Sequence, residues 1–100
     1  MTTVPITQGV AGTTEIVPGV PGYTIIVVGY VVVLDAAGTF GFETGSRPLS
    51  GLIPTDAKGG VAPGGGNETS PLLVCDKGGN LEIVTSGAKA FGHLTFFYDS

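Results

Sequence analysis

The chain has 100 residues, of which 42% are hydrophobic and only 12% are charged, and its formal net charge is -4. A chain of this length forms one domain with a single modest core. Its four Lys and Arg residues are too few to neutralise many phosphates, which argues against a nucleic-acid-binding protein. Ordinary soluble domains contain about 25% charged residues. We therefore expect much of this surface to be buried against other copies or a larger surface.

Residues 1–12 are predicted to form an extended N-terminal arm, and residues 13–100 a single β-sandwich domain. Pro5 lacks a backbone donor and is expected to interrupt pairing within the arm. Small apolar side chains of the arm would attach it to a partner: Val4, Ile6 and Val10.

The first strand is predicted at Thr13 to Val17, and a longer one follows at Tyr23 to Leu34. The longer run is β-branched and aromatic almost throughout, which favours the extended conformation. Alternate side chains of a strand point to opposite faces, and neither face of this run is polar. Such a strand is covered on both sides, by the second sheet of the domain and by another subunit or a loop. The alternation leaves open which face is core, and the residues assigned to a contact with another copy are Tyr23, Ile26, Val28, Tyr30 and Val32.

A transmembrane helix is the main rival interpretation of this run. Its twelve residues are too few, since a helix needs about 20 to cross the hydrocarbon core, and Asp35 closes the run. The first residues, Met1-Thr2-Thr3-Val4, carry no positive charge and are not followed by an apolar segment. A signal peptide is therefore not predicted.

Two hairpins are predicted beyond this run. The turn Asp35–Gly38 is expected to return the chain into an antiparallel strand at Thr39–Thr44, with both phenylalanines on one face. A second hairpin is expected to join Leu72–Asp76 to Leu81–Ser86, and the last strand is predicted at Gly92–Tyr98. Its aromatic residues cover both faces, which indicates core together with a contact surface.

Shorter edge strands are predicted at Leu49–Pro54 and Gly60–Pro63, where prolines are tolerated. The glycine-rich stretch Gly64–Thr69 is expected at a loop tip. It is not a phosphate loop, because no Gly-Lys-Ser/Thr follows it. About eight short strands without a helical period predict an all-β, antiparallel two-sheet sandwich.

Residues with catalytic potential are sparse. Cys75 lies alone in an apolar strand-like run, where a buried, inert thiol is favoured over a nucleophile. His93 lies in an otherwise apolar strand, where a hydrogen-bonded structural role is favoured over proton transfer. The acidic residues are scattered, so neither a metal site nor any other cofactor is expected. The chain is therefore predicted not to be an enzyme.

Several segments together resemble small virion proteins of tailed bacteriophages. They are Gly22-Tyr23-Thr24-Ile25-Ile26-Val27, Phe42-Glu43-Thr44-Gly45, Gly59–Pro63, Pro71–Ser86 and Gly92–Thr95 with the aromatic run that follows. The resemblance spans roughly residues 20–98 and implies a jelly-roll sandwich, commonly trimeric. Proteins of this group act as head decoration (cement) proteins or as modules of tail and head fibres, and the resemblance brings no catalytic residues.

The resulting prediction is a capsid decoration protein that forms a homotrimer and binds the major capsid protein. It would stabilise the expanded phage head by binding only that state. The expected location is the capsid surface of the virion after synthesis in the host cytoplasm, with no direct contact to nucleic acid or membrane.

The alternative is a fibre adhesion module that binds a host receptor or glycan. The sequence has no Trp, which lectins often use, and no repeats or coiled-coil stalk. A small β-sandwich enzyme is a third and weaker interpretation.

Overall fold

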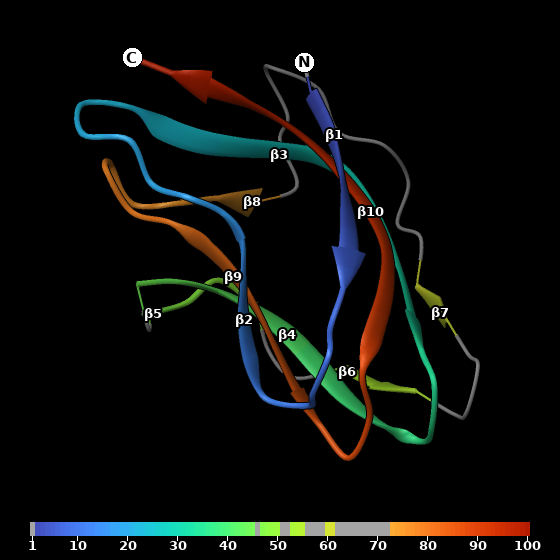
Figure 1. Cartoon of the computed structure of the whole chain (residues 1–100). Coiled ribbons are helices and arrows are strands. Elements are labelled where there is room, and N and C mark those ends of the chain that lie inside the picture. Colours follow the sequence, from blue (N-terminus) through green and yellow to red (C-terminus); the bar gives the residue numbers. More distant parts are fainter. Residues whose placement is uncertain (1, 46, 51–52, 56–59, 62–72) are drawn as a thin grey trace.

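The protein is an all-β sandwich of two antiparallel sheets, as predicted (Figure 1). The structure is a computed structural model and describes residues 2–45, 47–50, 53–55, 60–61 and 73–100. Ten strands lie in this described part of the chain. The loop tip predicted at Gly64–Thr69 falls outside the described residues.

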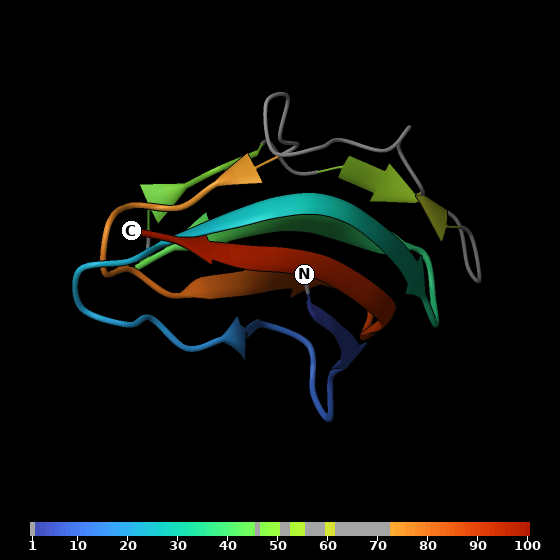
Figure 2. The ribbon, with the colours of Figure 1, turned by 90° about the horizontal axis from the view of Figure 1, so that it is seen from above.

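Each sheet consists of three longer strands and two short pieces. Sheet A contains β1 (Thr2–Thr7), β10 (Ala90–Asp99) and β3 (Thr24–Leu34), and β3 also pairs with β7 (Gly60–Val61) and β8 (Leu73–Val74). Sheet B contains β2 (Thr13–Val17), β9 (Leu81–Ser86) and β4 (Gly38–Thr44), and β4 also pairs with β5 (Arg47–Pro48) and β6 (Ile53–Thr55). The long strands β3 and β10 run side by side and bend together (Figure 2).

The strands pair in a nested order, from the two ends of the chain toward its middle. β1 pairs with β10, β2 with β9, β3 with β7 and β8, and β4 with β5 and β6. Both predicted hairpins are therefore wrong, because β3 and β4 lie in different sheets, as do β8 and β9. The turn sequences reverse the chain, but the reversal carries it across the sandwich instead of along one sheet.

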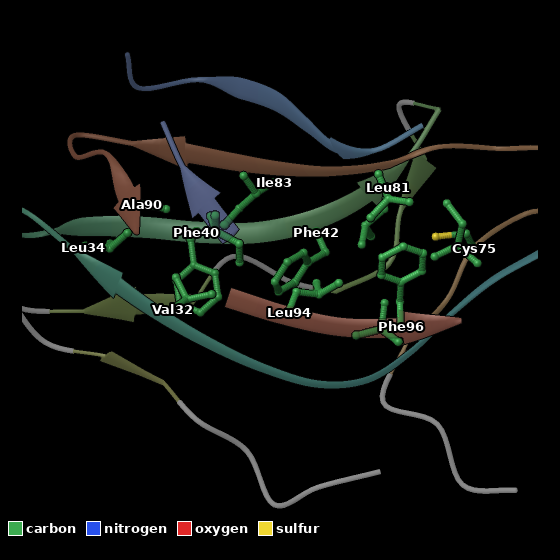
Figure 3. Close-up of a cluster of buried hydrophobic side chains, with 14 of the residues drawn as sticks. Val32, Leu34, Phe40, Phe42, Cys75, Leu81, Ile83, Ala90, Leu94 and Phe96 are labelled. Carbon is green, nitrogen blue, oxygen red and sulfur yellow. The ribbon is translucent and has the colours of Figure 1, made fainter. Parts of the chain in front are cut away.

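The core lies between the sheets and takes alternate side chains from both (Figure 3). Phe40 and Phe42 of β4 are fully buried and face the same way, as predicted. They lie among aliphatic side chains from the other long strands: Val32, Leu34, Leu81, Ile83 and Leu94. Full burial of such a side chain contributes about 1.5–3 kcal/mol, so these contacts dominate the stabilisation of the fold.

A bulge in β3 changes which residues face this core. Thr95 pairs with Gly29, but Phe96 pairs with Val27, so Val28 has no partner in β10. One extra residue in a strand inverts the alternation beyond it. The inward-facing residues of β3 are accordingly Ile25 and Val27 before the bulge, and Val32 and Leu34 after it. The uninterrupted alternation predicted for this run is wrong at this point.

Residues 2–7 are an edge strand and not a separate arm. β1 pairs with β10 from Thr2 to Thr7, and Ile6 is a core residue with only 2% of its side chain exposed. The N–H of Gln8 donates to the Ala90 carbonyl oxygen at 3.1 Å, which places Pro5 at a position whose N–H would point away from β10. Proline is compatible with an edge strand there, so it does not interrupt the pairing as predicted.

Gln8 fastens the connection between β1 and β2 through a buried polar network. Its side-chain oxygen accepts hydrogen bonds from the Thr85 hydroxyl and the Ala90 N–H, each at 2.8 Å. Its side-chain nitrogen donates to the Gly12 carbonyl at 3.0 Å and to the Thr14 hydroxyl at 3.1 Å. All four hydrogen-bonding positions of the amide are thereby satisfied. Nothing in the local sequence indicated that this glutamine is buried.

Candidate interaction surface

The outer face of sheet A is mostly apolar. The part that we call the sheet A face consists of Thr3, Pro5, Thr7, Val31, Val33, Phe91, His93, Thr95 and Phe97. These residues alternate along their strands with core residues such as Ile6, Val32 and Leu94, and therefore point away from the core. This set contains no Asp, Glu, Lys or Arg. Beyond Phe97 the same side continues with Ile26, Val28 and the charged residue Asp99.

Phe91 is the most prominent side chain of the sheet A face. It is 37% exposed and lies between Thr7 of β1 and Val33 of β3. In the next outward row, His93 lies between Pro5 and Val31. His93 is exposed, and it has no hydrogen-bond partner among the described residues, so the predicted hydrogen-bonded structural role is wrong here.

The outer face of sheet B has the opposite character. Glu15, Glu82 and Glu43 lie directly opposite one another across β2, β9 and β4, and we call them the glutamate row. Like charges in this arrangement are destabilising. The amide nitrogen of Asn80 donates to the Glu15 carboxylate at 3.1 Å, but no ion pair in the described part of the chain reaches the row. The described ion pairs lie elsewhere and are Arg47–Asp76 and Lys89–Asp35.

One end of the sandwich carries a small aromatic patch. The rings of Tyr23 and Tyr98 meet edge to face with centroids 6.3 Å apart, and both are partly exposed. The Tyr98 hydroxyl donates to the Pro18 carbonyl at 3.0 Å. A separate ion pair joins Arg47 of β5 to Asp76, which follows β8. The Arg47 guanidinium donates to both carboxylate oxygens of Asp76 and lowers the pKa of that carboxyl.

The three contact residues predicted within residues 1–12 lie in different surroundings. Ile6 is in the core, so its assignment to an interface is wrong. Val4 is half-buried and packs against the core. Val10 is 73% exposed in the connection between β1 and β2, and it is the only one of the three that is free to touch a partner.

The contact residues predicted in and before β3 are divided by the bulge. Val32 is fully buried in the core, and the Tyr30 ring packs 4.8 Å from Phe42, so both face inward. Ile26 and Val28 are buried but do not belong to the core cluster, because they lie on the other side of β3. Tyr23 precedes the strand and is exposed. The assignment of Val32 and Tyr30 to an interface is therefore wrong.

The described residues that could act in catalysis or bind a metal do not form a site. Cys75 is buried beside Ile25, and burial raises its pKa to about 11, so its thiol stays protonated at neutral pH. His93 pairs with Val31, which lies six residues beyond Ile25 along β3, a distance of about 20 Å. Its side chain also points away from the core, so His93 and Cys75 do not meet. Within the described ranges, no three His, Cys, Asp or Glu side chains are grouped as metal ligands. The same ranges contain no helix long and apolar enough to cross a bilayer.

Sequence reasoning missed Phe91, Val31 and Val33 as one surface because it assumed unbroken alternation in β3. Gly29 was the available signal, since a glycine inside an apolar strand often marks a bulge. The glutamate row had no such signal, because three residues far apart in sequence meet only through the pairing of their strands.

Searches of protein-family models, curated proteins and solved structures find no match to this chain. The resemblance to phage virion proteins therefore stays a prediction.

Proposed function

We propose that this chain is a capsid decoration protein of a tailed phage, which self-associates as a homotrimer and binds the major capsid protein. The nested pairing of the strands is the observation that carries the proposal. If β5 with β6, and β7 with β8, are each counted as one interrupted strand, eight strands pair first with last and second with last but one. This order supports a jelly roll, an architecture that viral capsid domains use.

The contrast between the two outer faces supports self-association. Among the described outward residues of sheet A only Asp99 is charged, whereas the glutamate row is acidic and faces the opposite direction. A protein with one nearly uncharged and one charged face can bury the first against other copies and keep the second hydrated. Cyclic symmetry with three copies closes such an assembly.

The connection between β1 and β2 supports attachment to a larger partner. The Gln8 network holds residues 8–12 against β9 and β10, and Val10 projects from their tip. A contact that is already rigid loses little entropy on binding. The attachment role predicted for the whole arm is thereby assigned to this tip.

A decoration protein acts through binding linkage. A ligand that binds only one state stabilises that state by about 2.7 kcal/mol per site when its free concentration is 100 times the Kd. Binding that requires the expanded lattice therefore opposes contraction and rupture of the filled head.

The test is cosedimentation of the purified protein with expanded and with unexpanded heads of a tailed phage that encodes the chain. We expect the protein to pellet with expanded heads only. Val10→Asp should weaken this binding and leave the thermal midpoint unchanged, whereas Val20→Asp, at another exposed valine, should bind as the wild type does. Pelleting with neither form, or equally with both, would contradict the proposal.

The tyrosine patch favours a fibre adhesion module as the second candidate. Exposed rings of Tyr23 and Tyr98 next to polar loop residues offer an apolar surface with hydroxyl groups at its border. A glycan array is the corresponding test. Binding that Tyr23→Ala abolishes, together with no binding to heads, would favour this function over decoration.

A further inference from the structure

We propose that the outer edge of β2 binds an extended segment of another protein as an additional strand of sheet B, and that this segment carries Lys or Arg opposite Glu15. Addition of a strand to a sheet edge is a common way for proteins to recognise an extended peptide. The inference does not depend on a role in a phage head.

The backbone groups of Thr13 and Glu15 point away from β9. Both backbone groups of Gly12 bond to Thr85, whose N–H donates to the Gly12 carbonyl at 2.9 Å and whose hydroxyl accepts from the Gly12 N–H at 3.1 Å. Because the direction of these groups alternates along an antiparallel strand, those of Thr13 and Glu15 face outward. In the described part of the chain nothing bonds to them. They are therefore available to an added strand.

The other sheet edges that the structure describes are protected against such pairing. β1, which lies with β2 along one side of the sandwich (Figure 2), contains Pro5, and the far edge of sheet B contains Pro48 in β5 and Pro54 in β6. β7 and β8 are two residues long. Proline and very short strands are common devices that block an edge. β2 has five residues and no proline, so its outward donors are all present.

The glutamate row determines which charge the added strand should carry. A strand beside β2 would place one side chain directly opposite Glu15, at the end of the row. Glu15 is exposed, and among the described residues only the amide of Asn80 bonds to its carboxylate, at one of the two oxygens. Opposite charges that face each other across two strands are stabilising and like charges are destabilising. Lys or Arg therefore fits this position.

The same charges disfavour a second copy of this chain at the edge. Two β2 strands paired with each other would bring the glutamate rows of both copies together. Within the described strands the only basic residue is Arg47, and its guanidinium is already bonded to both carboxylate oxygens of Asp76. The occupant is therefore a basic segment of a different protein.

The test is an NMR titration of the isotopically labelled protein with a short capped peptide of alternating valine and lysine. Its lysines would lie on the side of Glu15 and its valines on the side of the core. The bulge between Glu15 and Val17 limits regular pairing to a short stretch, so the peptide is added to high concentration. The control peptide has the same sequence with every backbone nitrogen methylated, which keeps the charge and removes the N–H donors.

Two variants separate local from general charge attraction. Glu15→Lys reverses the charge at the edge, and Asp99→Lys makes the same change at an exposed acid of β10 in the other sheet. Both positions are exposed, so both variants should fold, and circular dichroism verifies this.

We expect the unmethylated peptide to shift the amide resonances of Thr13 and Glu15 saturably, and the methylated peptide to leave them unchanged. Glu15→Lys should weaken binding about tenfold, because an exposed attraction becomes a repulsion. Asp99→Lys should bind as the wild type does. An absence of binding would overturn the inference. Equal binding of the two peptides, or equal weakening by the two variants, would also overturn it, because the contact would then be general charge attraction without an added strand.

Discussion

The side chain of Gln8 holds the connection between β1 and β2 in place through hydrogen bonds. Its amide bonds to groups of β9, β10, β2 and the connection before β2, and the bonds to Thr85 and Ala90 are buried. Such a network is stabilising only when it is complete, because each buried group left unpaired costs about 1–3 kcal/mol.

We expect Gln8→Leu to lower the free energy of unfolding by about 1–3 kcal/mol, since the buried Ala90 N–H loses its acceptor, whereas the Gly12 carbonyl still accepts from the Thr85 N–H. Urea denaturation measures the change. Thr7→Ala, at the exposed neighbouring position, is the control and should stay within about 0.5 kcal/mol of wild type. A neutral Gln8→Leu would mean that water replaces the amide.

We expect the buried thiol of Cys75 to lower the free energy of unfolding at alkaline pH. Burial raises the pKa of its thiol from 9.0 to about 11, so the folded state holds the proton at pH values where the unfolded chain releases it. Stability from this thiol is complete below pH 9 and is lost as the pH rises toward 11. The difference in unfolding free energy between wild type and Cys75→Ala should therefore narrow between about pH 9 and pH 11. A difference that is constant with pH would show that the thiol titrates normally.

The bulge at Val28 determines which of two neighbouring residues of β3 faces the core and which faces outward. Val32→Asp places an unpaired charge in the core, which costs several kcal/mol and should unfold the domain. Val33→Asp points outward and should leave the domain folded, with weaker self-association. Circular dichroism with sedimentation separates the two results. The reverse outcome would show that β3 alternates without a bulge.

Two substitutions near the N-terminus test whether β1 belongs to the folded domain. Ile6→Ala should lower the free energy of unfolding by about 3 kcal/mol, because Ile6 is buried between the sheets. For a domain of this size the thermal midpoint should fall by roughly 12–24 °C. Val10→Ala, at an exposed position of the same segment, should change it little. Equal and small effects would restore the separate arm that the sequence predicted.

The strands themselves were predictable, but their partners were not. The runs Thr13–Val17 and Leu81–Ser86 have the same bounds as β2 and β9, because β-branched and apolar residues bounded by Gly and Pro mark strands locally. Pairing depends on which strands the whole chain brings together, and a turn sequence such as Asp35–Gly38 carries no such information. The two hairpins failed for this reason.

The candidate surface was predicted only in outline. The idea that β3 is covered on both sides, and that part of that cover comes from outside, followed from its composition. The residues that form the sheet A face depend on the bulge and on β10 and β1 as neighbours. Val31 and Val33 were therefore assigned to neither role, and Ile6 and Val32 were assigned to the wrong one.

For the molecule as a whole, the distribution of charge organises the account. The chain has twelve charged residues, and the described ones lie in turns, at strand ends and in the glutamate row, which leaves the outer side of sheet A with Asp99 alone. A monomer of this kind would expose its apolar face to water, whereas an assembly would bury it and present the acidic faces and the tips near Val10 to its surroundings.

The most direct measurement of the central claim is a cryo-electron microscopy reconstruction of phage heads incubated with the purified protein. We expect additional density on expanded heads, arranged as clusters of three copies at regular lattice positions. Expanded heads that carry no additional density, or density formed by single separate copies, would contradict it.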